Sequence, residues 1–185
     1  MKSKYLGKNE IAAIRQASDD WLPFEVALLT GLRIGDVLKI RPRDLARDGV
    51  RYTAEKTGKN GFAPLPPEVL RTLRKNASGG WCFPSPKKAG AHLTRQAAWY
   101  RMKRAATAAG IETEGVSPHA LRKCFAVEKM HDGGLHAVQT ALQHESVGVT
   151  EIYALADWLT GENADKPLLR RDLMMIATKI AEMLR

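Results

Sequence analysis

The sequence predicts a mainly α-helical protein with one small antiparallel β-sheet, which is an α+β fold. Apolar residues recur at helical spacing along most of the 185 residues. Between residues 49 and 65 the spacing changes to every second residue, which is typical of strands. Hydrophobic residues make up 44% and charged residues 26%, as in ordinary globular proteins, so the chain as a whole is not a disordered one. The length favours a single domain over residues 1–185.

The N-terminal part of the chain predicts three helices. Residues 9–17 carry isoleucines at helical spacing. A second helix is expected over residues 22–32, with Gly31 suited to its end because glycine readily adopts a left-handed conformation. A third, short helix is expected over residues 34–40, and Pro42 limits its extension.

The β-rich segment predicts a hairpin over residues 49–65. The Gly-Lys-Asn-Gly cluster at residues 58–61 marks the expected turn. Two prolines then begin a helix that reaches about residue 75. Residues 76–90 are rich in Gly, Pro, Ser and Lys, which predicts a loop.

The C-terminal half predicts a series of helices. Thr94 is suited to cap a helix that runs to residue 109 and ends at Gly110. Ser117 is suited to cap the next helix, with Pro118 at its first position and its end near residue 134. The remaining predicted helices cover residues 135–143, 147–156 and 166–185, and the last of these is amphipathic.

The charge of the chain favours a polyanionic partner. Lys and Arg number 29 against 20 Asp and Glu, so the formal net charge is +9 and the pI is near 9.7. The simplest such partner is nucleic acid. No apolar run approaches the length of about 18 residues that spans a bilayer, and the N-terminus has no apolar signal core. The two cysteines, 42 positions apart, form no metal or redox pair, so we expect a reducing, cytoplasmic setting.

Chemistry-bearing side chains occur at five places. The segment TGLRIGD places Arg33 at a corner between two predicted helices. His119 and Arg122 lie three positions apart in a first helical turn, and therefore on one face. His144 ends a short predicted helix, Tyr153 lies in an apolar helix and Lys56 lies in the hairpin. Each of these has an ordinary structural interpretation when it is taken alone: a surface arginine, a solvated helix end, a core residue or an exposed lysine.

In their order and context these features resemble the tyrosine recombinase family, also called the phage-type integrases. The segment TGLRIGDVL at residues 30–38 is similar to the first arginine box of the family, and HALR at 119–122 to its His-x-Leu-Arg box. The segment LQHES at 142–146, with Tyr153 nine residues after its histidine, resembles the box that holds the second histidine and the nucleophile. KTGK at 56–59 resembles the hairpin lysine. The resemblance implies the catalytic-domain fold of that family.

The sequence departs from the family pattern at three points. Gln143 stands where the family commonly has Gly, and Lys123-Cys124 stands where His-Thr is frequent. Only 32 residues precede Arg33, too few for the N-terminal core-binding domain of most members. We therefore expect that domain to be absent, and two explanations stay open: a minimal recombinase, or the isolated catalytic domain of a longer protein.

The resemblance also implies a mechanism. Tyr153 would attack the scissile phosphate to form a 3′-phosphotyrosyl link and release a 5′-hydroxyl, with no metal, cofactor or ATP. Two guanidiniums can grip the non-bridging oxygens as charge builds on them. The expected catalytic residues are Arg33 and Arg122 for those oxygens, Lys56 to protonate the leaving oxygen, His119 to accept or hold the tyrosine proton, His144 to hydrogen-bond the phosphate, and Tyr153 as nucleophile. Asp36 is expected to orient the first arginine or its helix.

The expected partner is a duplex DNA recombination site. Basic residues outside the catalytic set would neutralise backbone phosphates. The residues expected to bind DNA are Lys39, Arg41, Arg43, Lys59, Lys87, Lys88, Arg95, Arg101, Lys103 and Arg104. The resemblance further implies four protomers on two sites, with an accessory DNA-bending protein as a further partner. For the helix at 166–185 two interpretations stay open: it packs as core within its own chain, or it is exchanged between protomers.

Three alternatives differ in their chemistry. A catalytically inactive or regulatory DNA-binding protein of the same fold would have no need of Tyr153. A type IB topoisomerase would share the covalent chemistry but relax a single duplex without strand exchange. A zinc enzyme fits poorly, because His131 and His136 are five apart with no cysteine pair beside them.

Overall fold

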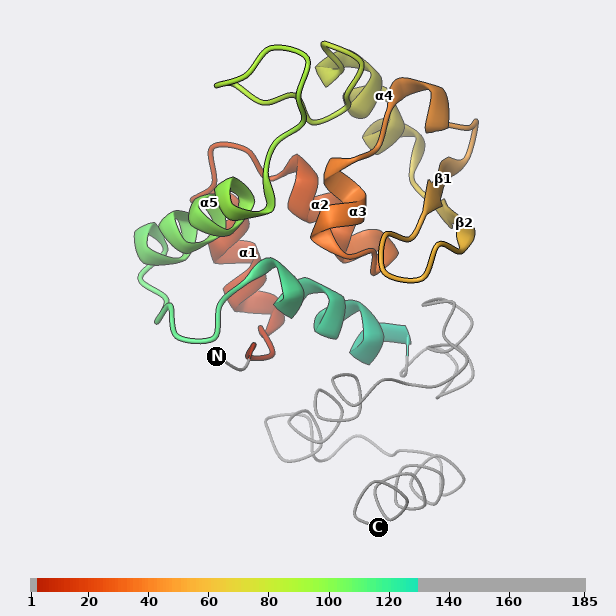
Figure 1. Ribbon diagram of the computed structural model, residues 1–185. Coiled ribbons are helices and arrows are strands. Elements are labelled where there is room, and N and C mark those ends of the chain that lie inside the picture. The colour runs from red at the N-terminus through yellow and green to blue at the C-terminus, as the bar shows by residue number, and fades with distance from the viewer. Residues whose placement is uncertain (1–2, 130–185) are drawn as a thin grey trace, which may run out of the picture. The chain divides into compact units, whose positions relative to one another are not determined.

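The computed structural model describes residues 3–129 (Figure 1). One compact unit of the chain runs to Arg122, and a second begins at Lys123. The predicted helices at residues 135–143, 147–156 and 166–185 lie outside the described residues. The same holds for the predicted end of the helix that starts at Pro118.

Three helices open the fold: α1 (Lys8–Gln16), α2 (Leu22–Thr30) and α3 (Ile34–Leu38). All three were predicted, but α2 and α3 each end two residues earlier than the sequence indicated. Helix α2 stops because Gly31 adopts a left-handed φ of 67° and its N–H returns to the carbonyl of Ala27. Helix α3 stops at Leu38, and Pro42 then opens the short 3₁₀ turn η1 (Pro42–Asp44).

The predicted hairpin forms, but its turn lies elsewhere. Strands β1 (Gly49–Thr53) and β2 (Asn60–Pro64) pair antiparallel, from Gly49 opposite Pro64 to Thr53 opposite Asn60. The prediction of a turn at residues 58–61 was therefore wrong, since the connection covers residues 54–59. The side chain of Thr53 donates a hydrogen bond to Asn60 at 2.7 Å, which ends the ladder at this pair. Gly58, at φ 68°, supplies the left-handed residue within the connection.

The second half of the described chain follows the prediction closely. Helix α4 (Pro67–Asn76) leads into the predicted loop, and α5 (Arg95–Ala108) follows it. The Thr94 hydroxyl accepts the N–H of Ala97 at 3.1 Å, which is the predicted cap. Gly110 follows α5 at a φ of 70°. A further helix occupies residues 118–129 of the described chain and starts at Pro118, as expected.

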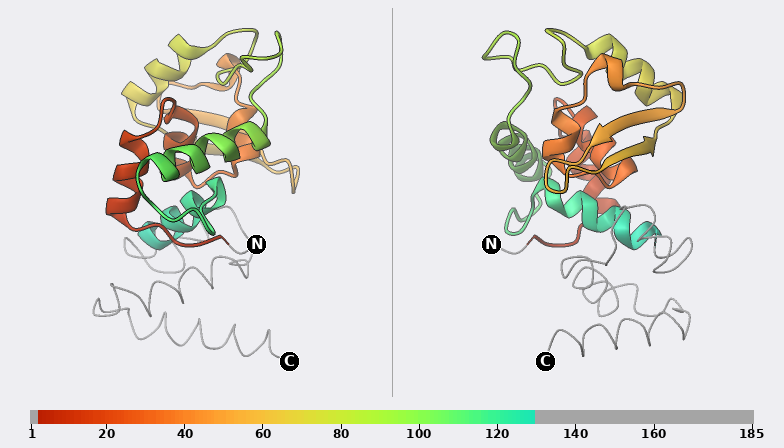
Figure 2. Two further views of the ribbon diagram at one scale, coloured as in Figure 1. Left: turned by 90° about the vertical axis from the view of Figure 1, so that its left-hand side faces the viewer. Right: turned by 45° about the vertical axis from the view of Figure 1, so that its right-hand side comes forward.

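The core lies where the helices of the first unit meet. Helix α1 packs on α5, and α2 packs on α3 and α4. Figure 1 shows α2 and α3 between α1 and α5 on one side and the hairpin with α4 on the other. The side chains of Ile14, Phe24, Leu70 and Met102 are completely buried, and each such burial contributes about 1.5–3 kcal/mol. The right-hand view of Figure 2 shows the hairpin beside α2 and α3, and a hydrogen bond from the Glu55 N–H to Asp36 joins the hairpin connection to α3.

Candidate active site

One pocket of about 310 Å³ gathers four of the six predicted catalytic residues. Its walls come from the α2–α3 corner, the β1–β2 connection, the start of α5 and the first turn of the helix at residues 118–129. The four residues are Arg33, Lys56, His119 and Arg122. His144 and Tyr153 lie outside the described residues.

Arg33 owes its place to the abrupt end of α2. The left-handed Gly31 turns the chain, and Arg33 precedes α3 in an extended conformation with φ −65° and ψ 141°. The hydroxyl of buried Thr30 accepts the N–H of Leu32 at 3.3 Å, which holds the corner together. The corner is therefore a fixed support for the Arg33 guanidinium.

Arg122 is buried at the bottom of this arrangement. Only 5% of its surface is exposed, and its Nη1 donates a hydrogen bond to the carbonyl oxygen of Gly31. A buried guanidinium is costly unless its donors are satisfied, so this bond ties Arg122 firmly to the corner that carries Arg33. Two cations from positions 89 residues apart in sequence (122 − 33) thus face one pocket.

Lys56 is held near the pocket by its neighbour in the chain. The backbone N–H of Glu55 donates to Oδ1 of Asp36 at 2.9 Å, and Asp36 is 5% exposed. The sequence pointed to a role for Asp36 in orienting Arg33 or its helix. The hydrogen bond in the structure runs instead to the hairpin connection, which it docks onto α3.

The pocket contains residues that sequence reasoning assigned elsewhere or missed. Arg95, which was predicted to bind DNA, lines the same pocket from the start of α5. A Cβ added to Gly35 would lie 3.1 Å from Cδ of Arg95 and 3.4 Å from Oε2 of Glu55. The side chains of Arg95 and Glu55 can therefore approach α3 closely because residue 35 is a glycine. The only sequence signal for Arg95 was its position directly after the predicted cap, Thr94. Glu55 gave no signal at all.

The phenol of Tyr52 is close enough to this site for its pKa to respond to the charges there. Burial raises the pKa of Tyr52 on β1 above its ordinary value, against the opposing effect of the Arg122 guanidinium. The carboxylate of Asp36 raises the pKa further. Tyr52 therefore stays protonated at neutral pH, which makes it a poor nucleophile.

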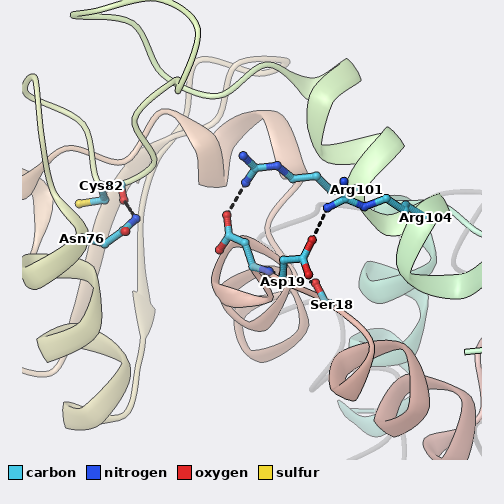
Figure 3. A network of polar contacts seen from close by, with 7 residues as sticks. Ser18, Asp19, Asn76, Cys82, Arg101 and Arg104 are labelled. Carbon is cyan, nitrogen blue, oxygen red and sulfur yellow. Dashed lines mark hydrogen bonds and ion pairs between the residues drawn. The ribbon is translucent and has the colours of Figure 1, made fainter. Parts of the chain in front are cut away.

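Three of the predicted DNA-binding residues of α5 have protein partners, namely Arg101, Lys103 and Arg104. Arg101 and Arg104 donate to the carboxylates of Asp20 and Asp19 in the α1–α2 connection. Figure 3 shows Asp19 beside the α5 arginines. Lys103 donates to the carbonyl of Thr113. The Arg101 side chain is 28% exposed, so its pair with Asp20 limits its access to a phosphate, whereas the Arg104 side chain is 70% exposed and its pair with Asp19 restricts it little.

The other predicted DNA-binding residues differ in their contacts and in the exposure of their side chains. Lys39 pairs with Glu55 at 3.0 Å, and the Arg41 guanidinium lies 4.2 Å from the ring centroid of Trp81. Arg43 is 76% exposed beside Asp44. The exposed remainder of the predicted set consists of Lys59, Lys87 and Lys88.

No metal centre is found among residues 3–129: they contain no group of three or more His, Cys, Asp or Glu side chains able to hold an ion. The helices within the same range include none that is long and apolar enough to cross a membrane. His131 and His136 lie beyond it.

The chain is similar to known recombinases. The model of the phage integrase family matches residues 4–158. The tyrosine recombinase XerD of Rhizobium meliloti (strain 1021) is 31% identical over 168 residues, which cover 82% of this chain and 53% of that protein. The chain thus spans about half the length of that relative.

Two solved structures have the same fold. A lambda integrase (75–356) dimer bound to a COC′ core site superposes with a TM-score of 0.72 at 22% identity, covering 92% of this chain and 64% of that one. A lambda integrase tetramer bound to a Holliday junction gives 0.67 at 22% identity, covering 90% and 50%. The predicted α+β fold, mainly helical with a small antiparallel sheet, is confirmed as the fold of the tyrosine recombinase catalytic domain.

Proposed function

The chain belongs to the phage integrase family, and from this membership we propose that it is a site-specific recombinase that cleaves and rejoins DNA through Tyr153. The observation that carries the proposal is the pocket that gathers Arg33, Lys56, His119 and Arg122. These are cationic or proton-transferring groups from separate parts of the chain, and the transfer of a phosphoryl group needs both kinds.

In the proposed cleavage step the protein itself supplies the nucleophile, the proton acceptor and the proton donor. The Tyr153 phenolate attacks phosphorus, the bond from phosphorus to the 5′-oxygen breaks, and Lys56 gives that oxygen its proton. His119 takes the phenolic proton, and His144 hydrogen-bonds the phosphate. The phosphotyrosyl ester keeps the energy of the broken bond, so a 5′-hydroxyl can reverse the step with no ATP.

Arg33 and Arg122 stabilise the charge of the transition state. Planar guanidiniums bind two phosphate oxygens at once, and this geometry suits the non-bridging oxygens of a pentacoordinate phosphorus. Because Arg122 is buried and bonded to the α2–α3 corner, it needs little rearrangement during the reaction. Such preorganised donors contribute several kcal/mol in a site that excludes water.

The proposed partners are two duplex recombination sites and three further copies of the chain. A lambda integrase of the same fold forms a tetramer on a Holliday junction, which supports a tetrameric reaction here. An accessory DNA-bending protein and a cytoplasmic location belong to the same proposal. The excess of 29 basic over 20 acidic residues suits the DNA partner.

A covalent trapping assay tests the proposal. Nicked duplexes from DNA that flanks the source gene are incubated with the protein and EDTA, then run on a denaturing gel. The nick lets the 5′-hydroxyl fragment leave, so cleavage cannot reverse. We expect a slow protein–DNA band with the natural protein and with Tyr100→Phe, a matched change at a 59% exposed tyrosine, and no band with Tyr153→Phe.

Each outcome separates the alternatives. A band that persists in Tyr153→Phe means that another residue is the nucleophile. DNA binding without any band indicates a DNA-binding protein that has lost catalysis. Relaxation of supercoiled plasmid without strand exchange indicates a topoisomerase.

A further inference from the structure

Glu55 connects the hairpin to α3 at two points. Its backbone N–H donates to the buried Asp36, as described above. Its side chain extends in the other direction, and Oε1 lies 3.0 Å from Nζ of Lys39, the residue directly after α3. One residue of the β1–β2 connection is thus held by both its backbone and its carboxylate.

Because Gly35 has no side chain, the Glu55 carboxylate can lie close to the backbone of α3. A Cβ built on Gly35 would lie 3.4 Å from Oε2 of Glu55 and 3.1 Å from Cδ of Arg95. The carboxylate therefore lies close over the start of α3, at the edge of the pocket that both residues line.

The next residue in the chain is Lys56. Its side chain is exposed and lines the same pocket as Arg33. Four rotatable torsions lie between the Lys56 backbone and its amine nitrogen, so the backbone must be fixed if the amine is to meet a particular oxygen atom. Misplacement of a reacting group by about 1 Å can cost 100-fold in rate.

We propose that Lys39 and Glu55 are positioning residues, whose ion pair holds the Lys56 amine within reach of the leaving 5′-oxygen. The inference rests on the proposed function, because it assigns a purpose to the pair only if Lys56 is the proton donor. Lys39, which the sequence predicted to bind DNA, would then support the hairpin connection instead.

The charges around Glu55 keep the pair intact at working pH. The hydrogen bond and charge of Lys39 lower the pKa of the Glu55 carboxyl below its ordinary value, with smaller contributions from Arg95 and His92. A lowered pKa means that the ion pair is complete above the ordinary value of about 4.3 and is lost only as the pH falls through the lowered one.

The pair is half exposed, with 44% of the Lys39 side chain and 49% of the Glu55 side chain accessible. Exposed ion pairs contribute little to folding stability. Removal of either partner should therefore reduce the cleavage rate while the melting temperature stays close to that of the natural protein.

The test compares two substrates under single-turnover conditions. The first is the nicked duplex, and the second has sulfur in place of the bridging 5′-oxygen at the scissile phosphate. A thiol has a pKa near 8.5, so the sulfur leaves as a thiolate without a donated proton. We expect Glu55→Gln and Lys39→Met to slow cleavage of the oxygen substrate about 2- to 5-fold, which is the largest effect that an exposed ion pair can have on the placement of Lys56. On the sulfur substrate both variants should cleave at close to the natural rate.

Matched controls separate positioning from charge loss. Glu68→Gln and Lys75→Met change exposed residues of α4, outside the pocket, and should leave both rates unchanged. The double variant of Lys39 and Glu55 should be no slower than the slower single variant, because both substitutions break one interaction. DNA affinity and its salt dependence should be unchanged in Lys39→Met. A phosphate contact would instead reduce the salt slope by about 0.9.

Several results overturn the inference. A natural rate in Glu55→Gln on the oxygen substrate, equal slowing on both substrates, or faster cleavage would each show that the pair does not position a proton donor. These outcomes leave the proposed function standing. Failure of the natural protein to form any adduct on either substrate would overturn the proposed function, and the inference with it.

Discussion

Replacement of Asp36 by Ala should loosen the attachment of the hairpin to α3. The Asp36 carboxylate is 5% exposed and accepts the Glu55 N–H at 2.9 Å. Loss of a hydrogen bond to a charged group costs about 1.5–3 kcal/mol. We take about 2 kcal/mol, since this contact is only partly buried. For a protein of this size each kcal/mol lowers the melting temperature by about 2–4 °C, so we expect a decrease of about 4–8 °C.

The matched variant Asp36→Asn keeps an oxygen acceptor at the same place but removes the charge. Neutral hydrogen bonds are roughly half as strong as charge-assisted ones, so we expect a decrease of about 2–4 °C. Thermal unfolding followed by circular dichroism measures both shifts, and the covalent trapping assay measures cleavage. Both variants should bind DNA but form adducts slowly, Asp36→Ala more so, because the connection that carries Lys56 is no longer docked. An unchanged melting temperature in Asp36→Ala would refute the reasoning.

Three other predictions rest on separate features. Gly49→Ala places a Cβ 2.4 Å from the carbonyl oxygen of Ala63, so the hairpin must shift, and urea unfolding should show a loss of about 1–3 kcal/mol. Burial raises the pKa of the Cys82 thiol to about 11, so only about one molecule in a thousand carries the thiolate at pH 8. Mass spectrometry should find Cys82 unmodified by iodoacetamide until urea unfolds the protein, and modification at the rate of a free thiol would contradict this. Arg43→Ala should reduce the salt slope of DNA binding by about 0.9, whereas Arg101→Ala should change it much less, and equal changes would show that the ion pair of Arg101 is displaced by DNA.

Local signals predicted most of the described fold. Thr94 and Gly110 bracket α5 because a hydroxyl cap and a left-handed glycine act on their immediate neighbours. The turn was predicted at residues 58–61 because this cluster begins and ends with a glycine. In the structure Gly58 lies in the connection, whereas Gly61 pairs with Tyr52 in β2. The choice between them depended on the cross-strand pair of Thr53 and Asn60, which composition alone does not indicate.

The sequence predicted the basic residues of the pocket. Three of the four sequence blocks located Arg33, Lys56, His119 and Arg122, and the structure gathers these residues in one pocket. A supporting role for Asp36 was predicted, but its partner Glu55 was not, because the two residues meet across a long stretch of chain. Asp36 and Glu55 are 19 residues apart, so no local pattern announces their hydrogen bond.

The net charge of +9 overstates how many basic side chains are available to DNA phosphates. A basic residue was counted as a phosphate contact from its type and region alone. Lys39, Arg101 and Arg104 each have a carboxylate partner in the folded chain. A phosphate that approached one of them would have to compete with that carboxylate, so its attraction is weaker than its formal charge suggests. The slope of DNA affinity against salt concentration counts the phosphates that the protein neutralises. This number should be smaller than the number of basic residues predicted to bind DNA, and the difference is the number of cations that pair with the protein's own carboxylates.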